Sequence, residues 1–116
     1  MFRLKYLSPM IPSFEIEKTV SFFKDLLGFK IVRDEKTYVI LMKDNLTIHI
    51  LRAGSDIGEM EIYLEVDDIG AVWNNMKDTI NGLKIKEPFD RDYGMREIHV
   101  IVPATKTLMF IGQEIK

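Results

Sequence analysis

Two predicted helices of this chain end at nearly the same four-residue pattern. GFKI (residues 28–31) and GLKI (residues 82–85) stand fifty-four positions apart, and each follows a stretch with apolar residues at helical spacing. Glycine readily ends a helix because it adopts the left-handed backbone conformation without a steric penalty. The echo therefore predicts one structural module that occurs twice in the chain.

The two predicted helices share the same organisation. The first should begin with Ser13 as its N-cap, and the second with Asp67 or Asp68. Gly28 should end the first helix and Gly82 the second. Each helix should bury one apolar face, formed by Ile16, Val20, Phe23 and Leu27 in the first and by Ile69, Val72, Met76 and Ile80 in the second.

One predicted strand precedes each helix and three follow it. In the first half these strands are residues 3–8, 29–33, 37–42 and 46–51, and in the second half 60–66, 83–86, 96–102 and 107–111. A loop at residues 53–58, rich in small and polar residues, links the halves. We therefore expect a single α+β domain over residues 1–116. It should contain two βαβββ modules, at about 1–54 and 58–116, whose strands form a curved mixed sheet around a cleft.

Composition narrows the possible partners. The chain has 116 residues, a net charge of −2 and no cysteine, and its sixteen basic residues are scattered among eighteen acidic ones. No basic stripe is present to follow a phosphate backbone, so nucleic acid is not an expected partner. No apolar run approaches the roughly 20 residues of a membrane span. We expect a cytoplasmic protein that binds neither nucleic acid nor membrane.

Strand alternation indicates which side chains could form a binding surface, because successive residues point to opposite faces. In residues 46–51, Ile48 and Ile50 form an apolar face and His49 points away from it. In residues 60–66, Glu61, Tyr63 and Glu65 lie opposite the apolar face. In residues 107–111, Leu108 and Phe110 match Ile48 and Ile50, which predicts that Met109 takes the place of His49. These second faces could line one trough.

Three stretches of the chain resemble a known family. SPMIPSFEIEKTVSFFKDLLGF, EVDDI and YGMREIHVIVP occur here in the order and spacing of the glyoxalase/bleomycin resistance/extradiol dioxygenase superfamily, also called vicinal oxygen chelate proteins. The opening stretch is most similar to the bleomycin-resistance branch. The resemblance implies paired βαβββ modules, a homodimer, and a role in antibiotic resistance through binding of a small molecule.

The enzymes of this superfamily hold a divalent metal at four strand positions, and the resemblance places Ser8, His49, Glu61 and Met109 there. Nickel, manganese, iron and zinc favour imidazole and carboxylate ligands, so only His49 and Glu61 suit such an ion. We therefore predict a metal-free cleft without a cofactor. The alternative is a metal-dependent lyase, isomerase or dioxygenase that uses His49 and Glu61 as ligands.

The resemblance also implies a ligand that is partly aromatic or cationic. Tyr38 stands where bleomycin-resistance proteins place a stacking ring, Tyr63 and Tyr93 could add rings, and carboxylates could receive a positive group. The predicted ligand-binding residues are Tyr38, His49, Glu61, Tyr63, Tyr93 and Met109. His49 and Glu61 could instead be ordinary sheet residues, and His99 is interpreted as structural. A third hypothesis is a structural or regulatory dimer whose cleft is vestigial.

Overall fold

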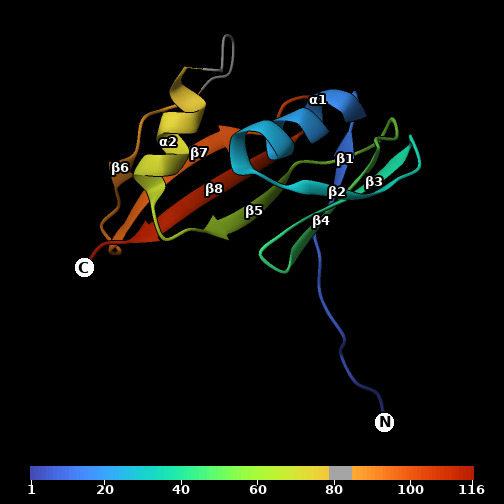
Figure 1. The fold of residues 1–116 in the computed structure, drawn as a ribbon, viewed down its shortest axis with the longest axis horizontal. Coiled ribbons are helices and arrows are strands. Elements are labelled where there is room, and N and C mark those ends of the chain that lie inside the picture. The colour runs from blue at the N-terminus through green and yellow to red at the C-terminus, as the bar shows by residue number, and fades with distance from the viewer. Residues whose placement is uncertain (79–84) are drawn as a thin grey trace.

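The two halves of the chain form two four-stranded sheets beneath two helices (Figure 1). The computed structural model describes residues 1–78 and 85–116. The strand order is β1-β4-β3-β2 in the first sheet and β5-β8-β7-β6 in the second. In both sheets the first strand of the module pairs in parallel with the last, and the remaining pairs are antiparallel. The predicted α+β fold of two βαβββ modules is confirmed.

The elements follow one another in the same order in both modules. The first module consists of β1 (Met10–Ser13), α1 (Ile16–Ser21), a π-helical segment (Phe22–Leu26), β2 (Lys30–Asp34), β3 (Tyr38–Lys43) and β4 (Leu46–Arg52). The second consists of β5 (Met60–Glu65), α2 (Ile69–Lys77), β6 (Phe89–Asp90), β7 (Met95–Ile101) and β8 (Thr107–Glu114).

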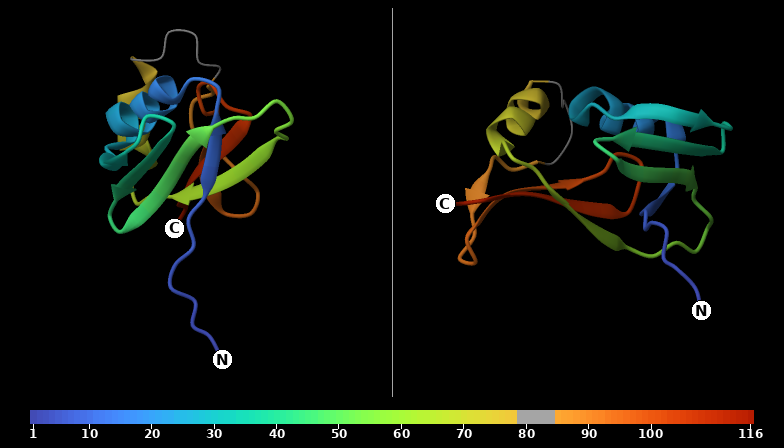
Figure 2. Two further views of the ribbon diagram at one scale, coloured as in Figure 1. Left: turned by 90° about the vertical axis from the view of Figure 1, so that its right-hand side faces the viewer. Right: turned by 60° about the horizontal axis from the view of Figure 1, so that its bottom comes forward.

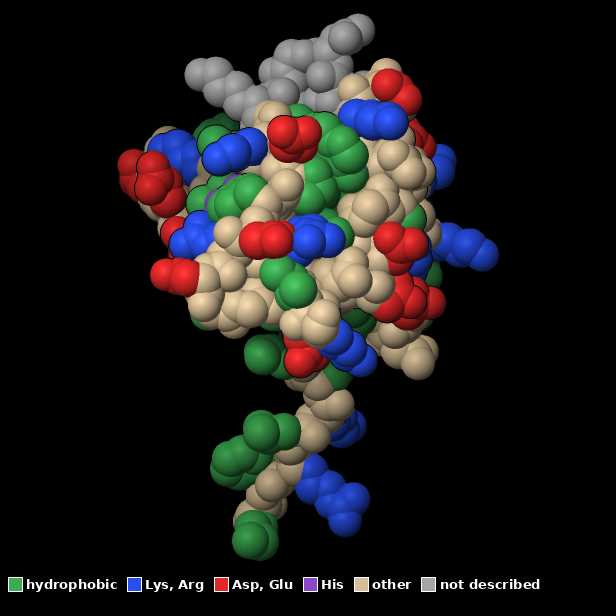
Figure 3. Space-filling view, turned by 90° about the vertical axis from the view of Figure 1, so that its left-hand side faces the viewer, with side chains coloured by type: hydrophobic (Ala, Val, Ile, Leu, Met, Phe, Trp, Pro, Cys, Tyr) green, Lys and Arg blue, Asp and Glu red, His purple; other side chains and the backbone are tan. Residues whose placement is uncertain are grey.

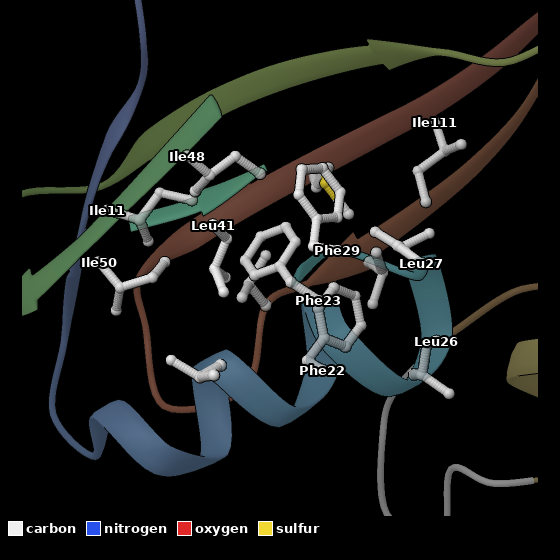
Figure 4. Packing of buried hydrophobic residues seen from close by; sticks show 14 of the residues in the cluster. Ile11, Phe22, Phe23, Leu26, Leu27, Phe29, Leu41, Ile48, Ile50 and Ile111 are labelled. Atoms are coloured by element: carbon white, nitrogen blue, oxygen red, sulfur yellow. The ribbon is translucent and has the colours of Figure 1, made fainter. Parts of the chain in front are cut away.

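Both helices lie over one face of the sheets, and none of the described helices lies over the opposite faces (Figure 2). The predicted helical faces are buried as expected where the structure describes them, although Val72 is only half-buried. Figure 4 shows how Phe22, Phe23 and Phe29 pack with aliphatic side chains from the strands. We call the helix-free side of each sheet its open face, and it is there that polar side chains of the strands are exposed.

The helix ends follow the predicted chemistry in part. Asp68 is the N-cap of α2 and accepts a hydrogen bond from the Ala71 amide at 3.1 Å, as predicted. Gly28 has a φ of +78°, the left-handed conformation that favours glycine after a helix. Ile80 and Gly82 lie outside the described residues.

The first strand lies further along the chain than predicted. It forms at Met10–Ser13, where Ile11 is fully buried and aligned with Ile50, whereas residues 3–8 are not a strand. Ser13 is therefore not the N-cap of α1, a position that Glu15 holds. The Ser13 hydroxyl instead shares a 2.6 Å hydrogen bond with the Thr19 hydroxyl. The alternation of residues 3–8 resembles a strand, but in the described chain no neighbouring strand pairs with it.

The edge of the second sheet also differs from the prediction. A strand was expected at residues 83–86, of which 83 and 84 lie outside the described residues. Ile85 forms an isolated bridge with Val100, and the edge strand β6 lies at Phe89–Asp90. This later strand brings Phe89 beside β7, in register with Glu97.

Candidate functional site

A tyrosine and a histidine meet on the open face of the first sheet. The Tyr38 hydroxyl and His49 Nδ1 share a hydrogen bond, and the two rings are perpendicular with centroids 5.6 Å apart. Tyr38 begins β3 and His49 lies on β4, two registers away, so the pair bridges neighbouring strands diagonally. His49 is only 8% exposed. Both residues thus lie on the same face of the first sheet, and the Nδ1 atom of His49 is engaged by Tyr38.

A larger polar cluster lies on the open face of the second sheet. Glu97, only 2% exposed, accepts hydrogen bonds from the Tyr93 hydroxyl at 2.6 Å and from His99 Nε2 at 2.7 Å. Burial alone would raise the pKa of Glu97. The hydrogen bonds from Tyr93 and His99, together with the nearby basic groups of His99 and Arg91, outweigh burial and lower that pKa. The cluster is thus a buried carboxylate held in its charged form by two donors.

Aromatic rings enclose the imidazole of this cluster. His99 lies 4.9 Å from the Phe89 ring and 4.2 Å from the Phe110 ring, measured between centroids. The Glu97 carboxylate accepts the hydrogen bond from His99, so the Nε2 atom of His99 carries the proton. The sequence interpretation treated His99 as structural and left Glu97 unassigned. Alternation along REIH could have found both, because residues two apart on a strand share a face.

Tyr63 provides a third polar group on the open side of β5. Its ring is 54% exposed, and its hydroxyl donates to Glu65 Oε1 at 2.9 Å. Partial burial of the hydroxyl, followed by the hydrogen bond to Glu65 and its charge, raises the pKa of Tyr63 to about 12. Tyr63 is therefore a hydrogen-bond donor throughout the neutral pH range, and a ligand that approaches this face meets a ring and a carboxylate together.

Met109 does not take the place of His49. It is 1% exposed and lies on the helix-facing side of β8 together with Ile111, while Leu108 and Phe110 lie on the open face. Its partner across β7 is the buried Val100. The predicted register was wrong by one residue, which moves every side chain of the strand to the opposite face.

The four positions suggested for a metal do not fit one. The Ser8 hydroxyl donates to the Thr47 carbonyl at 2.7 Å, and Met109 is in the core. His49 is in the first sheet, whereas Glu61 is exposed in the second. Among the described residues, no three histidine, aspartate or glutamate side chains gather closely enough to hold an ion. Within the described residues, the four suggested positions thus do not form the set of about three ligands that a catalytic metal site needs.

An apolar groove of about 490 Å³ lies where the two modules meet. Its lining comes from the N-terminal segment, the β3–β4 hairpin, and strands β5 and β8, including Tyr6, Met42, Leu46, Tyr63, Leu64 and Met109. Sequence reasoning missed this groove, because it depends on how the modules sit together. Two predicted ligand-binding residues, Tyr63 and Met109, are among its lining residues, although Met109 is only 1% exposed and does not lie on the open face.

Apolar side chains also project from the N-terminal arm, which we define as residues 1–7. Figure 3 shows this arm extending away from the body of the protein. Five large apolar side chains on it are at least 71% exposed: Met1, Phe2, Leu4, Tyr6 and Leu7. Isolated exposed apolar residues are ordinary, but a contiguous set of this kind marks an interaction surface. In the described chain, no helix is long and apolar enough to cross a membrane.

Several solved structures share this architecture. A bleomycin resistance determinant encoded on the transposon Tn5 has a TM-score of 0.77 and 20% identity, covering 96% of this chain and 98% of that one. A bleomycin-binding protein from Streptomyces verticillus, complexed with copper(II)-bleomycin, has a TM-score of 0.71 and 20% identity, covering 96% and 97%. A lactoylglutathione lyase from Agrobacterium tumefaciens has a TM-score of 0.75 and 9% identity, covering 94% and 92%. At these identities the likeness concerns the fold.

The amino-acid sequence identifies the family directly. None of the curated proteins matches the chain significantly in sequence. The sequence profile of the Glyoxalase/Bleomycin resistance protein/Dioxygenase superfamily matches residues 5–105, which is most of the chain. Together with the paired βαβββ modules, this match means that the chain belongs to the glyoxalase/bleomycin resistance protein/dioxygenase superfamily.

Proposed function

We propose that this protein is a cytoplasmic small-molecule binding protein of the bleomycin-resistance type. It would sequester a partly aromatic or cationic ligand in a metal-free cleft of a homodimer, and could thereby confer antibiotic resistance. The observation that carries the proposal is the pairing of rings with acceptors on the open faces: Tyr38 with His49, Tyr63 with Glu65, and Tyr93 with Glu97.

The chemistry of these pairs suits a flat ligand with a positive group. Offset rings and cations over rings each contribute on the order of 1 kcal/mol. The carboxylates of Glu61 and Glu65 are exposed near the Tyr63 ring, where they could receive a charged substituent. Two of the similar solved structures are named for bleomycin, a resistance determinant and a bleomycin-binding protein. Their fold is shared by this chain, which supports the same class of ligand here.

A second copy of the chain would complete the cleft. Two apolar regions support a homodimer: the N-terminal arm and the open faces, where Met10, Tyr93 and Ile101 are each about half exposed. Covering apolar area of this kind favours association by about 25 cal/mol per Å² before the costs of binding. In such a dimer the open face of one sheet could face that of another, so that the tyrosines line a shared cavity.

The enzyme alternative has less support. The superfamily includes lyases, and a lactoylglutathione lyase shares the fold. However, Glu61 lies in the other sheet from His49, and the hydrogen bond to Tyr38 at Nδ1 leaves only Nε2 of His49 for a metal. A metal enzyme would need the second copy to supply further ligands, and nothing in the described residues favours that arrangement.

The proposal is tested by calorimetric titration of the purified protein with a ligand panel. The panel contains a bleomycin-type glycopeptide, a mitomycin-type drug and several planar aromatic cations, each with a neutral analogue as its control. We expect at least one member to bind more tightly than about 1 mM, with sedimentation showing a dimer. Failure of every member to reach that affinity would overturn the proposed function.

A further inference from the structure

The side chain of Arg91 lies against two aromatic rings of the second module. Its guanidinium carbon is 5.2 Å from the centroid of the Tyr93 ring and 5.6 Å from that of the Phe89 ring. The ammonium group of Lys86 lies 4.6 Å from the Phe89 centroid. Cations are attracted to the electron-rich faces of such rings. The two rings therefore already receive positive groups, both of which come from the chain itself.

These rings are held in place from beneath. The Tyr93 hydroxyl is anchored to the buried Glu97 carboxylate, and the Phe89 ring packs edgewise on His99, which bonds the same carboxylate. Side chains fixed by such partners lose little further freedom when a ligand arrives. The Glu97 carboxylate also accepts from the Tyr93 hydroxyl, which places an acidic group directly behind that ring. The arrangement is thus a prebuilt receptor for a flat positive group.

The hydrogen bonds that hold Arg91 in its turn come from its backbone. Its amide donates to the Met95 carbonyl at 2.7 Å, and its carbonyl accepts from the Gly94 amide at 3.2 Å, which fixes the turn at residues 91–94. The ion pairs found among the described residues do not include its guanidinium, whereas Arg96 nearby is held by Asp90 at 2.6 Å. The Arg91 side chain can therefore leave the rings without breaking an ion pair or moving the backbone.

We propose that Phe89, Tyr93 and Glu97 form a subsite for a planar cation, such as an amidinium or guanidinium group of a ligand, and that Arg91 fills this subsite until the ligand displaces it. This inference rests on the proposed function, because it assigns the positive end of the ligand to one place and makes Arg91 an internal competitor. Removal of Arg91 should consequently tighten the binding of planar cations.

The test uses benzamidinium as the probe and benzamide as its neutral analogue, with affinities measured by nuclear magnetic resonance titration. Arg91→Gln should bind benzamidinium about threefold to tenfold more tightly than the unmodified protein, as expected for removing a competing contact of this strength. Arg52→Gln is the control for charge, since it removes the same charge from an exposed residue of β4 without removing a ring contact. Tyr93→Leu should abolish the gain in the Arg91→Gln background, whereas Tyr93→Phe should keep it.

The same titration can also monitor the resonances of the Arg91 side chain. Ring currents should shift its δ protons upfield in the free protein, and benzamidinium should return them toward the value of free arginine. Equal or weaker binding by Arg91→Gln, an equal gain in Arg52→Gln, or equal binding of benzamide would each overturn the subsite. The ligand panel is measured separately. If a panel drug binds but Arg91→Gln does not change the affinity for benzamidinium, the subsite is wrong and the proposed function stands. If no panel drug binds but Arg91→Gln tightens benzamidinium binding, the proposed function alone is wrong.

Discussion

The two modules carry different chemistry on the same framework. On the first sheet, Tyr38 meets His49 directly, whereas on the second, Tyr93 meets His99 through the buried carboxylate of Glu97. The strand order and the side that the helices cover are the same in both modules. The two modules thus share one framework and differ on their open faces, where a buried carboxylate bridges the hydroxyl and the imidazole in the second module.

The two modules should differ most in the free energy of unfolding that is lost when Glu97 or Tyr38 is changed. Glu97→Ala leaves the Tyr93 hydroxyl and a partly buried N–H of His99 without their acceptor, so we expect a loss of about 2–3 kcal/mol in the free energy of unfolding. Tyr38→Phe removes only the single hydroxyl bond of the first sheet and should cost about 0.5–1.5 kcal/mol. Urea unfolding of both variants measures the two losses of stability. A loss in Tyr38→Phe as large as that in Glu97→Ala would contradict the proposed asymmetry.

Ligand affinity should depend on the first sheet through the ring of Tyr38. If its ring stacks on the ligand, Tyr38→Ala should weaken binding of a panel drug by about 1–2 kcal/mol. Tyr38→Phe keeps the ring and should retain most of the affinity. Circular dichroism of both variants checks that the fold is intact. Unchanged affinity in Tyr38→Ala would remove the first sheet from the site and leave binding to the second.

The second sheet should also confer a pH dependence of stability. The pKa of Glu97 is lower in the folded chain than its unfolded value of about 4.3. Its contribution to stability is therefore fully present above about pH 4.3 and is lost as the pH falls through the folded pKa. Urea unfolding between pH 7 and pH 3 should show the advantage of the unmodified protein over Glu97→Gln shrinking only in the acidic part of this range. A constant advantage down to pH 3 would show that the charge of Glu97 is not the cause.

We expect the smallest effect in the pKa of Tyr63, a residue that is 54% exposed. Its pKa is raised to about 12, first by burial of the hydroxyl and then by Glu65. Glu65→Gln should move this pKa part of the way toward the ordinary value of about 10, since the charge is removed and the burial stays. Carbon-13 resonance titration of the tyrosine ring measures the shift. A pKa of Tyr63 that does not fall in Glu65→Gln would exclude Glu65 as a cause.

Much of the fold could be predicted because apolar periodicity and turn residues act locally. The buried faces of both helices, the Asp68 cap and the Gly28 stop depend on nearby residues alone. Pairing is different, because it depends on distant partners. Residues 3–8 alternate like a strand, but the structure places β1 at Met10–Ser13, where Ile11 meets the core.

The candidate site was harder to predict for the same reason. A one-residue error in matching the two modules put Met109 on the wrong face, and a short apolar strand such as TLMFI reads plausibly in either phase. The contact between Tyr38 and His49 was not predicted, although the short turn of their hairpin fixes the register that produces it. The alternation of β7 places Glu97 and His99 on one face, but their aromatic neighbours come from β6 and β8 and could not be predicted from it. The roles of the predicted ligand-binding residues remain predictions until a ligand is bound.

The central claim is that the cleft binds its ligand without a metal. Its most direct test is calorimetric titration of a panel drug into protein stripped of metal with a chelator, repeated after addition of nickel, manganese, zinc or ferrous iron, with a His49→Ala, Glu61→Ala double variant alongside. The account predicts binding tighter than about 1 mM in the stripped protein, with no gain from any ion. Binding that appears only when a metal is added, and is lost in the double variant, would contradict it and favour the metal-dependent enzyme.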